Sequence, residues 1–251
     1  MTGRASDMTG KVALVTGAAG GLGRATALAL AKAGAQMCIV DHNAAGLAET
    51  AAMIGGTEFV YTTDLSQPDN CKATVEAAIA NFGQLDALCN VAGVLKLANS
   101  HEMALADWNL VIAVNLTAPF LLSQAAIPYL LAANGAIVNV SSLAAHIGEA
   151  YAAAYCASKG GLSQMTKAMA MEYMKQPIRI NAISPGGMAT PIGASFVPPA
   201  GADVELLGRY RPIRGLVEVE DMANMIAYLA SPAAAGFHGA DIQMDRGITA
   251  G

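Results

Sequence analysis

The sequence predicts an α/β fold: a single domain over residues 1–251, with a doubly wound parallel β-sheet and helices on both faces. Short β-branched apolar runs alternate with longer Ala- and Leu-rich amphipathic segments, which is the pattern of successive βαβ units. The short runs are almost continuously apolar, as expected for strands buried on both faces. Because 54% of the residues are hydrophobic and 13% are charged, the chain can fill one large core.

The predicted elements follow one another in strict alternation. "KVALVTG" (11–17) predicts a buried strand, and "LGRATALALAKAG" (22–34) predicts a helix that ends at Gly34. Six more strands are predicted, each separated from the next by a helical pattern: "QMCIVD" (36–41), "EFVYTTD" (58–64), "ALCNVAG" (87–93), "AIVNVSS" (136–142), "IRINAIS" (178–184) and "ADIQMD" (240–245). Right-handed crossovers between parallel strands place ligands at the carboxyl ends of the strands.

One segment interrupts this alternation. Between Pro185 and Pro212 the chain carries three further prolines and several glycines, a composition too irregular for a core element. A long insertion at the ligand-binding edge of a sheet is more often a lid than a structural loop. We therefore predict a mobile substrate-binding flap over residues 188–212, poorly ordered without ligand and settled on binding.

Charge and hydropathy limit the classes of partner. A net charge of -5 without a local Lys/Arg cluster argues against nucleic acid as a partner. The N-terminal "MTGRASDMTGKV" is polar and unlike a signal peptide, and the longest apolar stretches are interrupted by Asn, Pro or Gln. These features argue against a membrane span and predict a cytoplasmic protein. The high apolar fraction also suggests that copies of the chain cover part of its surface.

The cysteines and histidines do not predict a metal site. The four cysteines, Cys38, Cys71, Cys89 and Cys156, lack metal-type or CxxC spacing, so we expect buried reduced thiols. Cys156 lies next to Tyr155 and could instead be a reactive thiol. The histidines have no partners at metal-ligand spacing, so we predict no catalytic metal.

A glycine-rich turn predicts a dinucleotide site of the Rossmann type. "TGAAGGLG" (16–23) follows the first predicted strand and opens the first predicted helix. Gly17, Gly21 and Gly23 let the backbone turn tightly and approach a pyrophosphate, which the N–H groups of a helix N-terminus bind. The spacing is Gly-x-x-x-Gly-x-Gly rather than Gly-x-Gly-x-x-Gly, so a tight turn without a ligand remains the alternative.

Asp41 strengthens the cofactor interpretation and favours NAD. It ends the second predicted strand, 18 residues beyond Gly23, where an acid can accept hydrogen bonds from the adenosine ribose hydroxyls. The alternative is that Asp41 caps the helix beginning near Asn43. A carboxylate repels a 2′-phosphate, and no Arg or Lys precedes Gly21 in the loop or follows Asp41 in "DHN". NAD is therefore predicted rather than NADP.

"YCASK" (155–159) predicts the catalytic pair. Tyr155 and Lys159 are four residues apart, so their side chains leave the same face of a helix. An ammonium favours the ionised phenolate, and a tyrosine whose pKa is lowered in this way can act as an acid or base near neutral pH. Ser142 lies 13 residues before Tyr155, at the carboxyl end of a predicted strand. Ser141 is the competing serine, but strand alternation turns it to the opposite side.

Asn115 is a further candidate because of the proline that follows it. In a helix the N–H of residue 119 would bond the Asn115 carbonyl, but Pro119 has no N–H to donate. The carbonyl is therefore free to hold a water molecule. The alternative is a helix kink without a functional role.

Taken together, these motifs resemble those of the compact, single-domain short-chain dehydrogenases/reductases. "TGAAGGLG", "NVAG", the Asn of "VNLT", Ser142, "YCASK" and "SPGGMATP" occur in the order found in that family, over about residues 11–247. The resemblance implies hydride transfer between NAD(H) and an alcohol or ketone. It implies that Ser142 bonds the substrate oxygen, that Tyr155 exchanges the proton, and that Lys159 holds the ribose and lowers the tyrosine pKa. Asn115 would hold a water that links Lys159 to solvent. The spacing between serine and tyrosine in the family also selects Ser142 rather than Ser141.

The resemblance extends to the cofactor contacts. Asp64 is expected to flank the adenine, "NVAG" (90–93) to line the adenosine side, and "SPGGMATP" (184–191) to meet the nicotinamide. The full set implied is Gly17, Gly21, Leu22, Gly23, Asp41, Asp64, Leu65, Asn90, Ala92, Gly93, Tyr155, Lys159, Pro185, Gly186, Met188 and Thr190. Two positions depart from the family pattern: Val91 stands where Asn is usual, which should loosen a hydrogen bond of the central strand, and Arg246 stands where Gly is usual.

The candidate substrate pocket is largely apolar. Its expected residues are Ser142, His146, Tyr151, Gly187, Ile192 and Phe196. Without an Arg or Lys to pair a carboxylate or phosphate, a neutral, moderately hydrophobic secondary alcohol or ketone is predicted, and a cyclic or steroid-like alcohol is one example. His146 could orient the substrate or simply lie at the rim.

Two other functional classes and an oligomer complete the expectations. An acyl-carrier-protein ketoreductase would need a basic patch for its acidic carrier, and this acidic chain shows none clearly. A non-catalytic NAD-binding sensor or scaffold would have no need for the complete Asn–Ser–Tyr–Lys set. The resemblance implies a homotetramer built from the helices that carry Trp108 and Tyr155.

Overall fold

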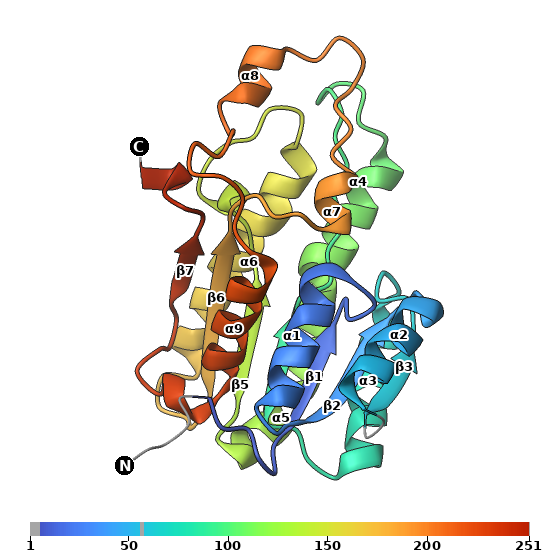
Figure 1. Ribbon diagram of the computed structural model, residues 1–251, viewed down its shortest axis with the longest axis vertical. Helices are drawn as coiled ribbons and strands as arrows, with labels where there is room; N and C mark the ends of the chain where they lie inside the picture. The colour runs from blue at the N-terminus through green and yellow to red at the C-terminus, as the bar shows by residue number, and fades with distance from the viewer. Residues whose placement is uncertain (1–5, 56–57, 251) are drawn as a thin grey trace.

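The computed structural model describes residues 6–55 and 58–250, and seven parallel strands form one sheet within them. The strand order is β3-β2-β1-β4-β5-β6-β7 (Figure 1). All seven predicted strands are confirmed, with the bounds β1 Val12–Thr16, β2 Gln36–Asp41, β3 Phe59–Thr62, β4 Ala87–Asn90, β5 Ala136–Val140, β6 Arg179–Pro185 and β7 Asp241–Met244. The doubly wound fold class predicted from the sequence is therefore correct.

The order of the strands creates the ligand-binding edge. The chain builds outward from β1 through β2 to β3, then crosses back to place β4 on the other side of β1. Val15 of β1 is consequently paired with Ile39 of β2 on one side and with Cys89 of β4 on the other. Loops that leave the carboxyl ends of β1 and β4 diverge at this switch point, and the crevice between them accepts ligands in folds of this kind.

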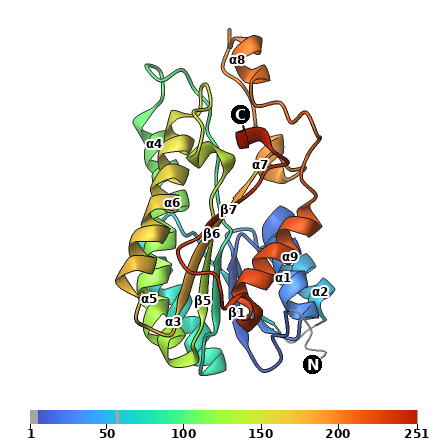
Figure 2. The same ribbon diagram turned by 90° about the vertical axis from the view of Figure 1, so that its left-hand side faces the viewer.

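Helices cover both faces of the sheet (Figure 2). Three of them, α1 (Gly21–Lys32), α2 (Ala44–Ile54) and α9 (Val219–Ala230), lie on one side. The other side carries α3 (Pro68–Phe82), α4 (Leu105–Ile112), α5 (Ala118–Ala133) and α6 (Ala153–Glu172). The two short helices α7 (Pro191–Ala194) and α8 (Val204–Gly208) stand above the carboxyl ends of the strands. They lie within the predicted flap.

Two apolar cores result, one on each face of the sheet. Successive residues of β1 serve opposite cores, because strand side chains alternate. Val15 packs in the core that includes Leu30 of α1 and Ile226 of α9. Leu14 packs in the other core, with Leu122 of α5. Every residue of β1 is buried, which explains its continuously apolar sequence.

Buried amides tie the central strands to α6. The Asn90 Nδ2 donates to the Asn139 Oδ1 at 2.8 Å, and the Asn139 Nδ2 donates to the Thr166 Oγ1 at 2.9 Å. Next to this network, the Thr16 hydroxyl accepts hydrogen bonds from the backbone N–H groups of Val91 (3.0 Å) and Ala92 (3.1 Å). The residue that departs from the family pattern, Val91, is thus held through its backbone.

Leu105–Ala133, the continuous run of α4, a π turn and α5, is long and apolar enough to cross a membrane by length and composition. In this fold 44% of its most apolar window is buried, and α5 packs against α3 and the sheet. Its outer face still exposes Trp108, Phe120 and Tyr129. The apolar character of the run therefore reflects a buried face together with an uncovered one.

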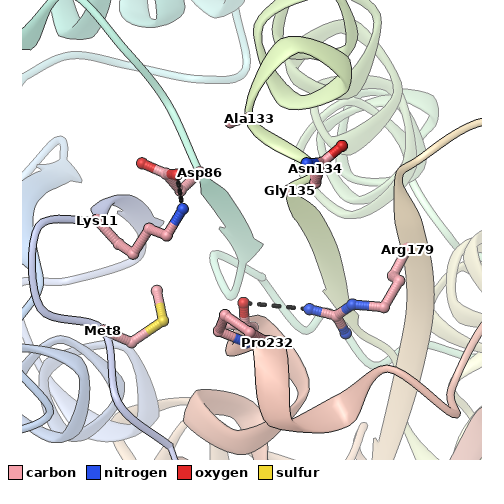
Figure 3. A pocket seen from close by; sticks show the side chains of 9 residues that line it. Met8, Lys11, Asp86, Ala133, Asn134, Gly135, Arg179 and Pro232 are labelled. Carbon is pink, nitrogen blue, oxygen red and sulfur yellow. Dashed lines mark hydrogen bonds and ion pairs between the residues drawn. The ribbon is translucent and has the colours of Figure 1, made fainter.

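The amino ends of the strands close on a small crevice (Figure 3). Lys11 approaches Asp86 with 2.9 Å between Nζ and Oδ1. From the opposite side, Arg179 donates to the Leu229 carbonyl at 2.7 Å and to the Ser231 carbonyl at 2.8 Å, where a cation suits the C-terminus of α9. The cavity measures about 20 Å³, which is room for a water molecule but not for a dinucleotide or an alcohol.

Candidate active site

The glycine-rich turn between β1 and α1 forms a cradle without side chains. Gly17 has a φ of 72°, and a Cβ on it would lie 2.9 Å from the Ala92 backbone. A Cβ on Gly23 would lie 2.0 Å from the Gly17 carbonyl oxygen. Larger residues cannot occupy these positions, so the loop brings bare backbone to the N-terminus of α1. This is the geometry that binds a pyrophosphate.

Asp41 lies beside this cradle and does not cap α2. Its Oδ2 accepts from the Ala19 N–H at 3.2 Å, and its Oδ1 accepts from the Asn43 N–H at 3.0 Å. The cap of α2 is Asn43, whose Oδ1 accepts from the Gly46 N–H at 3.1 Å. The capping alternative for Asp41 is therefore excluded, and its carboxylate is fixed at the end of β2.

Arg24 is held away from this carboxylate. It donates to the Ala19 carbonyl at 2.6 Å, to the Thr50 hydroxyl at 2.9 Å and to the Glu49 carboxylate at 2.6 Å. With its donors used in this way, the guanidinium joins the glycine-rich turn to α2. The cradle thus has the negative charge of Asp41 at the Ala19 N–H and the positive charge of Arg24 at the Ala19 carbonyl.

The remaining predicted adenosine-side residues surround the same edge of the sheet. Leu65 is buried, while Asp64 is exposed and accepts from the Ser66 N–H at 2.9 Å. This hydrogen bond is the main reason why the pKa of Asp64 lies below its ordinary value. Gly93 marks the far end of the segment, since a Cβ on it would lie 3.7 Å from the Lys159 Nζ. The segment after β4 thus leads from the cofactor cradle to the catalytic residues.

The predicted catalytic serine and tyrosine meet above the carboxyl end of β5. Ser142 opens a short 3₁₀ turn, where its Oγ accepts from the Ala144 N–H at 3.2 Å. The side chains of Ser142 and Tyr155 are hydrogen-bonded to each other. Ser141 faces the interior, where its hydroxyl pairs with the Ser163 hydroxyl at 2.7 Å and with the Lys159 carbonyl at 3.1 Å. Only Ser142 of the two is directed at the phenol.

Lys159 lies one turn further along α6 and is buried, with 3% of the residue exposed. Its Nζ donates to the Val140 carbonyl at 2.8 Å and lies 5.8 Å from the centre of the Tyr155 ring. Burial lowers the pKa of Lys159 from 10.5 to about 8, because a low-dielectric environment disfavours the ammonium.

The expectation of a lowered pKa at Tyr155 is not met in this structure, although Lys159 lies nearby. The pKa of Tyr155 is raised to about 12. Burial is the largest cause, and the negative charges of Glu149 and Cys156 add to it, while the hydrogen bond from Ser142 opposes it. The spacing of Tyr155 and Lys159 could not reveal this balance, because it depends on how deeply the phenol is enclosed and on an acid from another segment.

Asn115 lies in a π turn, Ala113–Thr117, between α4 and α5. The Ala118 N–H bonds the Ala113 carbonyl, five residues back, and Pro119 offers no N–H to the Asn115 carbonyl. The expected interruption is therefore present as a π turn, a feature frequent at functional sites. The Asn115 side chain accepts from the Val94 N–H at 2.8 Å and donates to the Ser158 hydroxyl at 3.1 Å, which ties the turn to α6.

The predicted nicotinamide end follows β6. Gly186 is tightly enclosed, since a Cβ on it would lie 2.8 Å from the Asp245 Cα, and the preceding Pro185 is buried. Met188 forms an isolated bridge with Val217. Thr190 caps α7 through a hydrogen bond from Gly193.

The flap begins directly above the glycine-rich turn. A Cβ on Gly21 would lie 2.9 Å from the Pro191 Cδ, and a Cβ on Gly93 would lie 3.7 Å from the Ile192 Cδ1. Ile192 is thus close to the catalytic residues. Phe196, further along the flap, is exposed, and Gly187 lies beside Leu216.

Two of the three polar residues expected in the substrate pocket, His146 and Tyr151, contact other parts of the protein. The His146 Nε2 lies 3.1 Å from the Ser184 Oγ and 3.3 Å from the Asp241 Oδ2, so its ring joins the loop after β5 to β6 and β7. Tyr151 has a φ of 68°, and its hydroxyl accepts from the Asp203 N–H at 2.8 Å. Both residues shape the loop that leads to α6.

Two residues absent from the sequence-based site, Tyr210 and Glu149, also belong to this region. The Tyr210 hydroxyl accepts from the Ala150 N–H at 2.8 Å and donates to the Gly148 carbonyl at 2.6 Å. These contacts join residues some 60 positions apart, and no motif in the sequence predicts them. Glu149 had a signal, since it is the one acid in the otherwise apolar stretch between Ser142 and Tyr155.

The chain is similar to known proteins over most of its length. Residues 17–249 match the family model described as enoyl-(acyl carrier protein) reductase. D-threitol dehydrogenase from Mycolicibacterium smegmatis is 39% identical over 247 residues, covering 96% of this chain and 94% of the relative. Cyclohexanol dehydrogenase from an Acinetobacter species is 37% identical over 244 residues, covering 95% of each chain.

A solved structure agrees over the whole fold. The crystal structure of 3-ketoacyl-(acyl-carrier-protein) reductase from Brucella melitensis complexed with NADH has a TM-score of 0.88 and 31% sequence identity. It covers 97% of this chain and 100% of the other. The sheet, the glycine-rich cradle and the Ser–Tyr–Lys cluster are thus found in a chain whose relatives are oxidoreductases by name.

The buried ammonium predicts that Lys159→Met stabilises the protein at pH 7. The ordinary pKa of 10.5 describes the unfolded chain, and the folded value is about 8. Ionised Lys159 therefore destabilises the folded state below pH 8, and the effect disappears as the pH rises toward 10.5. The difference between the two pKa values corresponds to about 3 kcal/mol of folding free energy. The net gain is smaller, because in Lys159→Met the Val140 carbonyl loses its hydrogen-bond donor.

Urea unfolding across this pH range measures the effect. The gain of Lys159→Met over wild type should be largest at pH 7 and shrink above pH 8. Lys167→Met, on an exposed position of the same helix, should leave stability within about 0.5 kcal/mol of wild type. If the stability gain of Lys159→Met does not change with pH, the buried ammonium is not the source of the destabilisation in wild type.

Proposed function

This chain belongs to the short-chain dehydrogenase/reductase family of oxidoreductases, and on that premise we propose an NAD-dependent alcohol dehydrogenase/ketone reductase. Its reaction transfers a hydride between NAD(H) and a neutral, moderately hydrophobic secondary alcohol or ketone. The observation that carries the proposal is the meeting of Ser142, Tyr155 and Lys159 at the carboxyl end of β5, next to a backbone cradle that begins at Gly17.

The residues present fit a dinucleotide. The cradle that a Cβ on Gly17 or Gly23 would fill suits a pyrophosphate. Asp41 is proposed to accept hydrogen bonds from the adenosine ribose, and Lys159 from α6 is proposed to hold the other ribose. NAD, when bound, supplies the carbon that accepts or releases the hydride.

The proposed proton chemistry belongs to Tyr155. In ketone reduction the phenol donates its proton to the substrate oxygen, and in alcohol oxidation the phenolate removes it. Burial keeps the phenol protonated in the resting site, so it is ready as an acid. The ammonium of Lys159 and the positive charge of an oxidised nicotinamide favour the phenolate that forms. Ser142 is proposed to hold the reacting oxygen by a hydrogen bond.

Lys159 and Asn115 are proposed to reload the proton. A lysine with a pKa of about 8 can hold or release a proton close to neutral pH. The Asn115 carbonyl receives no N–H from Pro119 and is proposed to hold a water between Lys159 and solvent. The π turn supports this role because it places Asn115 in an interruption of the regular α-helix, a feature frequent at functional sites.

Preference for NAD over NADP is proposed from the charge at the end of β2. Asp41 would repel a 2′-phosphate, and the donors of the nearby Arg24 are used by the glycine-rich turn and α2. A cyclic secondary alcohol is favoured as substrate by the apolar Ile192 near Gly93 and by the similarity to a cyclohexanol dehydrogenase. An acyl-carrier-protein ketoreductase stays the alternative, supported by the similarity to such a reductase.

We propose a homotetramer that covers the outer face of α5 and α6. An apolar groove of about 590 Å³ opens there, lined by Leu116, Thr117, Phe120, Gly161, Gln164, Met165 and Ala168. Trp108 and Tyr129 are exposed on the same helical run. A second copy of the chain would bury this surface, as obligate interfaces do.

The functional test combines a substrate panel with Tyr155→Phe. Wild type with NAD should produce NADH absorbance with at least one cyclic secondary alcohol. Tyr155→Phe should lower kcat about 10²- to 10⁴-fold, because the acid/base is lost, while fluorescence titration shows unchanged NADH binding. Retained turnover in this variant would remove the phenol from the mechanism. No signal with any alcohol or ketone would favour a non-catalytic sensor.

Asp41→Ala should narrow the preference for NAD over NADP. The variant removes the carboxylate that repels a 2′-phosphate, so kcat/KM with NADP should rise relative to that with NAD. Asp64→Ala is the matched control, because it removes an acid expected at the adenine and should affect both cofactors equally. An unchanged ratio in Asp41→Ala would show that this carboxylate does not contact the ribose.

Phe120→Glu should dissociate the proposed tetramer. Its ring is exposed in the groove, and a carboxylate there would be buried without a partner in the assembly. Sedimentation velocity should give a tetramer for wild type and smaller species for the variant. Met53→Glu, at an exposed apolar position on α2, should leave the tetramer intact. A monomeric wild type would refute the assembly.

A further inference from the structure

Glu149 occupies an unusual position in the loop between β5 and α6. It stands seven residues after Ser142 and six before Tyr155, and its backbone is fixed at both polar groups. The Glu149 N–H approaches the Cys156 Sγ at 3.4 Å, and the Glu149 carbonyl accepts from the Ala152 N–H at 3.2 Å. The Glu149 backbone is thus held against the first turn of α6, which carries Tyr155.

The flap fixes the same loop from the opposite side. Tyr210 bonds the residues on both sides of Glu149, through the Gly148 carbonyl and the Ala150 N–H. Tyr151 bonds the Asp203 N–H of the flap. Hydrogen bonds therefore join the loop to the flap beside the space into which a substrate bound at Ser142 and Tyr155 would extend.

The carboxylate of Glu149 is not paired within this space. Across residues 6–55 and 58–250, its oxygens make no hydrogen bond or ion pair, although the residue is half-buried. Neither oxygen is sealed from solvent, so both can be reached by a ligand. Water can therefore reach this carboxylate, and a ligand that displaces the water must supply a hydrogen-bond donor in its place.

The electrostatics place this carboxylate close to the reaction. After burial, its negative charge is one of the causes that raise the pKa of both Tyr155 and Cys156, so the carboxylate and the phenol influence each other. The pKa of Glu149 is itself raised, because burial disfavours its charge. A hydrogen-bond donor next to Glu149 would stabilise the ionised carboxylate and would weaken the effect of its charge on Tyr155.

Building on the proposed function, we propose that Glu149 accepts a hydrogen bond from a second hydroxyl group of the substrate, and so selects diols and polyols over mono-alcohols. One carbinol oxygen lies at Ser142 and Tyr155, and a hydroxyl on a neighbouring carbon reaches the carboxylate. That hydroxyl donates a hydrogen bond to the Glu149 carboxylate and partly neutralises its negative charge. Formation of the phenolate at Tyr155 then meets less opposition, so the benefit extends to kcat as well as KM.

A neutral hydroxyl fits this site better than an ammonium. Burial disfavours the ionised form of Glu149, and a hydroxyl can pair with the carboxylate or with the protonated acid. An ammonium requires the ionised form and must itself lose its hydration. The site therefore favours a diol over an amino alcohol of the same shape.

The test compares cyclohexanol with cis-cyclohexane-1,2-diol as substrates with NAD. Wild type should show the higher kcat/KM with the diol. Glu149→Leu removes the acceptor and should lower kcat/KM for the diol about 10- to 100-fold, the range of a hydrogen bond to a charged group. Activity on cyclohexanol should be unchanged or higher. Glu149→Gln retains a neutral acceptor and should lie between wild type and Glu149→Leu.

Controls separate specificity from folding. Glu172→Leu, at an exposed position near the end of α6, should leave both activities unchanged, and thermal melting with NADH titration should show that the Glu149 variants are folded and bind cofactor. A loss equal for both substrates, or no change in their ratio, would overturn the inference while leaving the proposed function intact. Preference for cis-2-aminocyclohexanol over the diol would also overturn it. No turnover of any alcohol by wild type would reject both.

Discussion

The buried ammonium of Lys159 is the constraint on which the site depends. It is removed from water, which lowers its pKa to about 8, and it needs the Val140 carbonyl at 2.8 Å as an acceptor. A buried charge persists only where its surroundings are fixed around it. The end of β5, the first turns of α6 and the ring of Tyr155, 5.8 Å away, must therefore keep one arrangement.

Polar side chains inside the fold fix that arrangement. Asn139 of β5 bonds Asn90 of β4 and Thr166 of α6, so the central strands cannot shift relative to α6 without breaking buried hydrogen bonds. Asn115 connects the π turn to Val94 and to Ser158. Such networks rigidify a core, although the buried Asn90 Oδ1 has no partner among the described residues. In this chain they converge on α6 from two different elements.

The sequence was sufficient for the strands, because their continuously apolar runs require a sheet covered on both faces. It was insufficient where contacts join distant segments. Pro119 predicted a missing hydrogen bond, but not whether the helix would kink or widen into a π turn. The pKa of Tyr155 was predicted in the wrong direction, because burial of the phenol raises it and the charge of Glu149 adds to this rise. His146 was expected at the substrate, yet its partners Ser184 and Asp241 come from β6 and β7.

The flap and the loop before α6 act on the same space, which links substrate enclosure to substrate recognition. Tyr151 adopts a φ of 68°, an unfavourable conformation for an aromatic residue that persists only when its surroundings hold it. Its carbonyl accepts from the Ala98 N–H at 2.9 Å and its hydroxyl from Asp203. Because Tyr210 bonds the residues on both sides of Glu149, it holds the backbone that carries this carboxylate. A substrate hydroxyl that reaches Glu149 would therefore meet an acceptor whose backbone is already fixed, and a hydrogen bond in a partly buried site is stronger than one made in water.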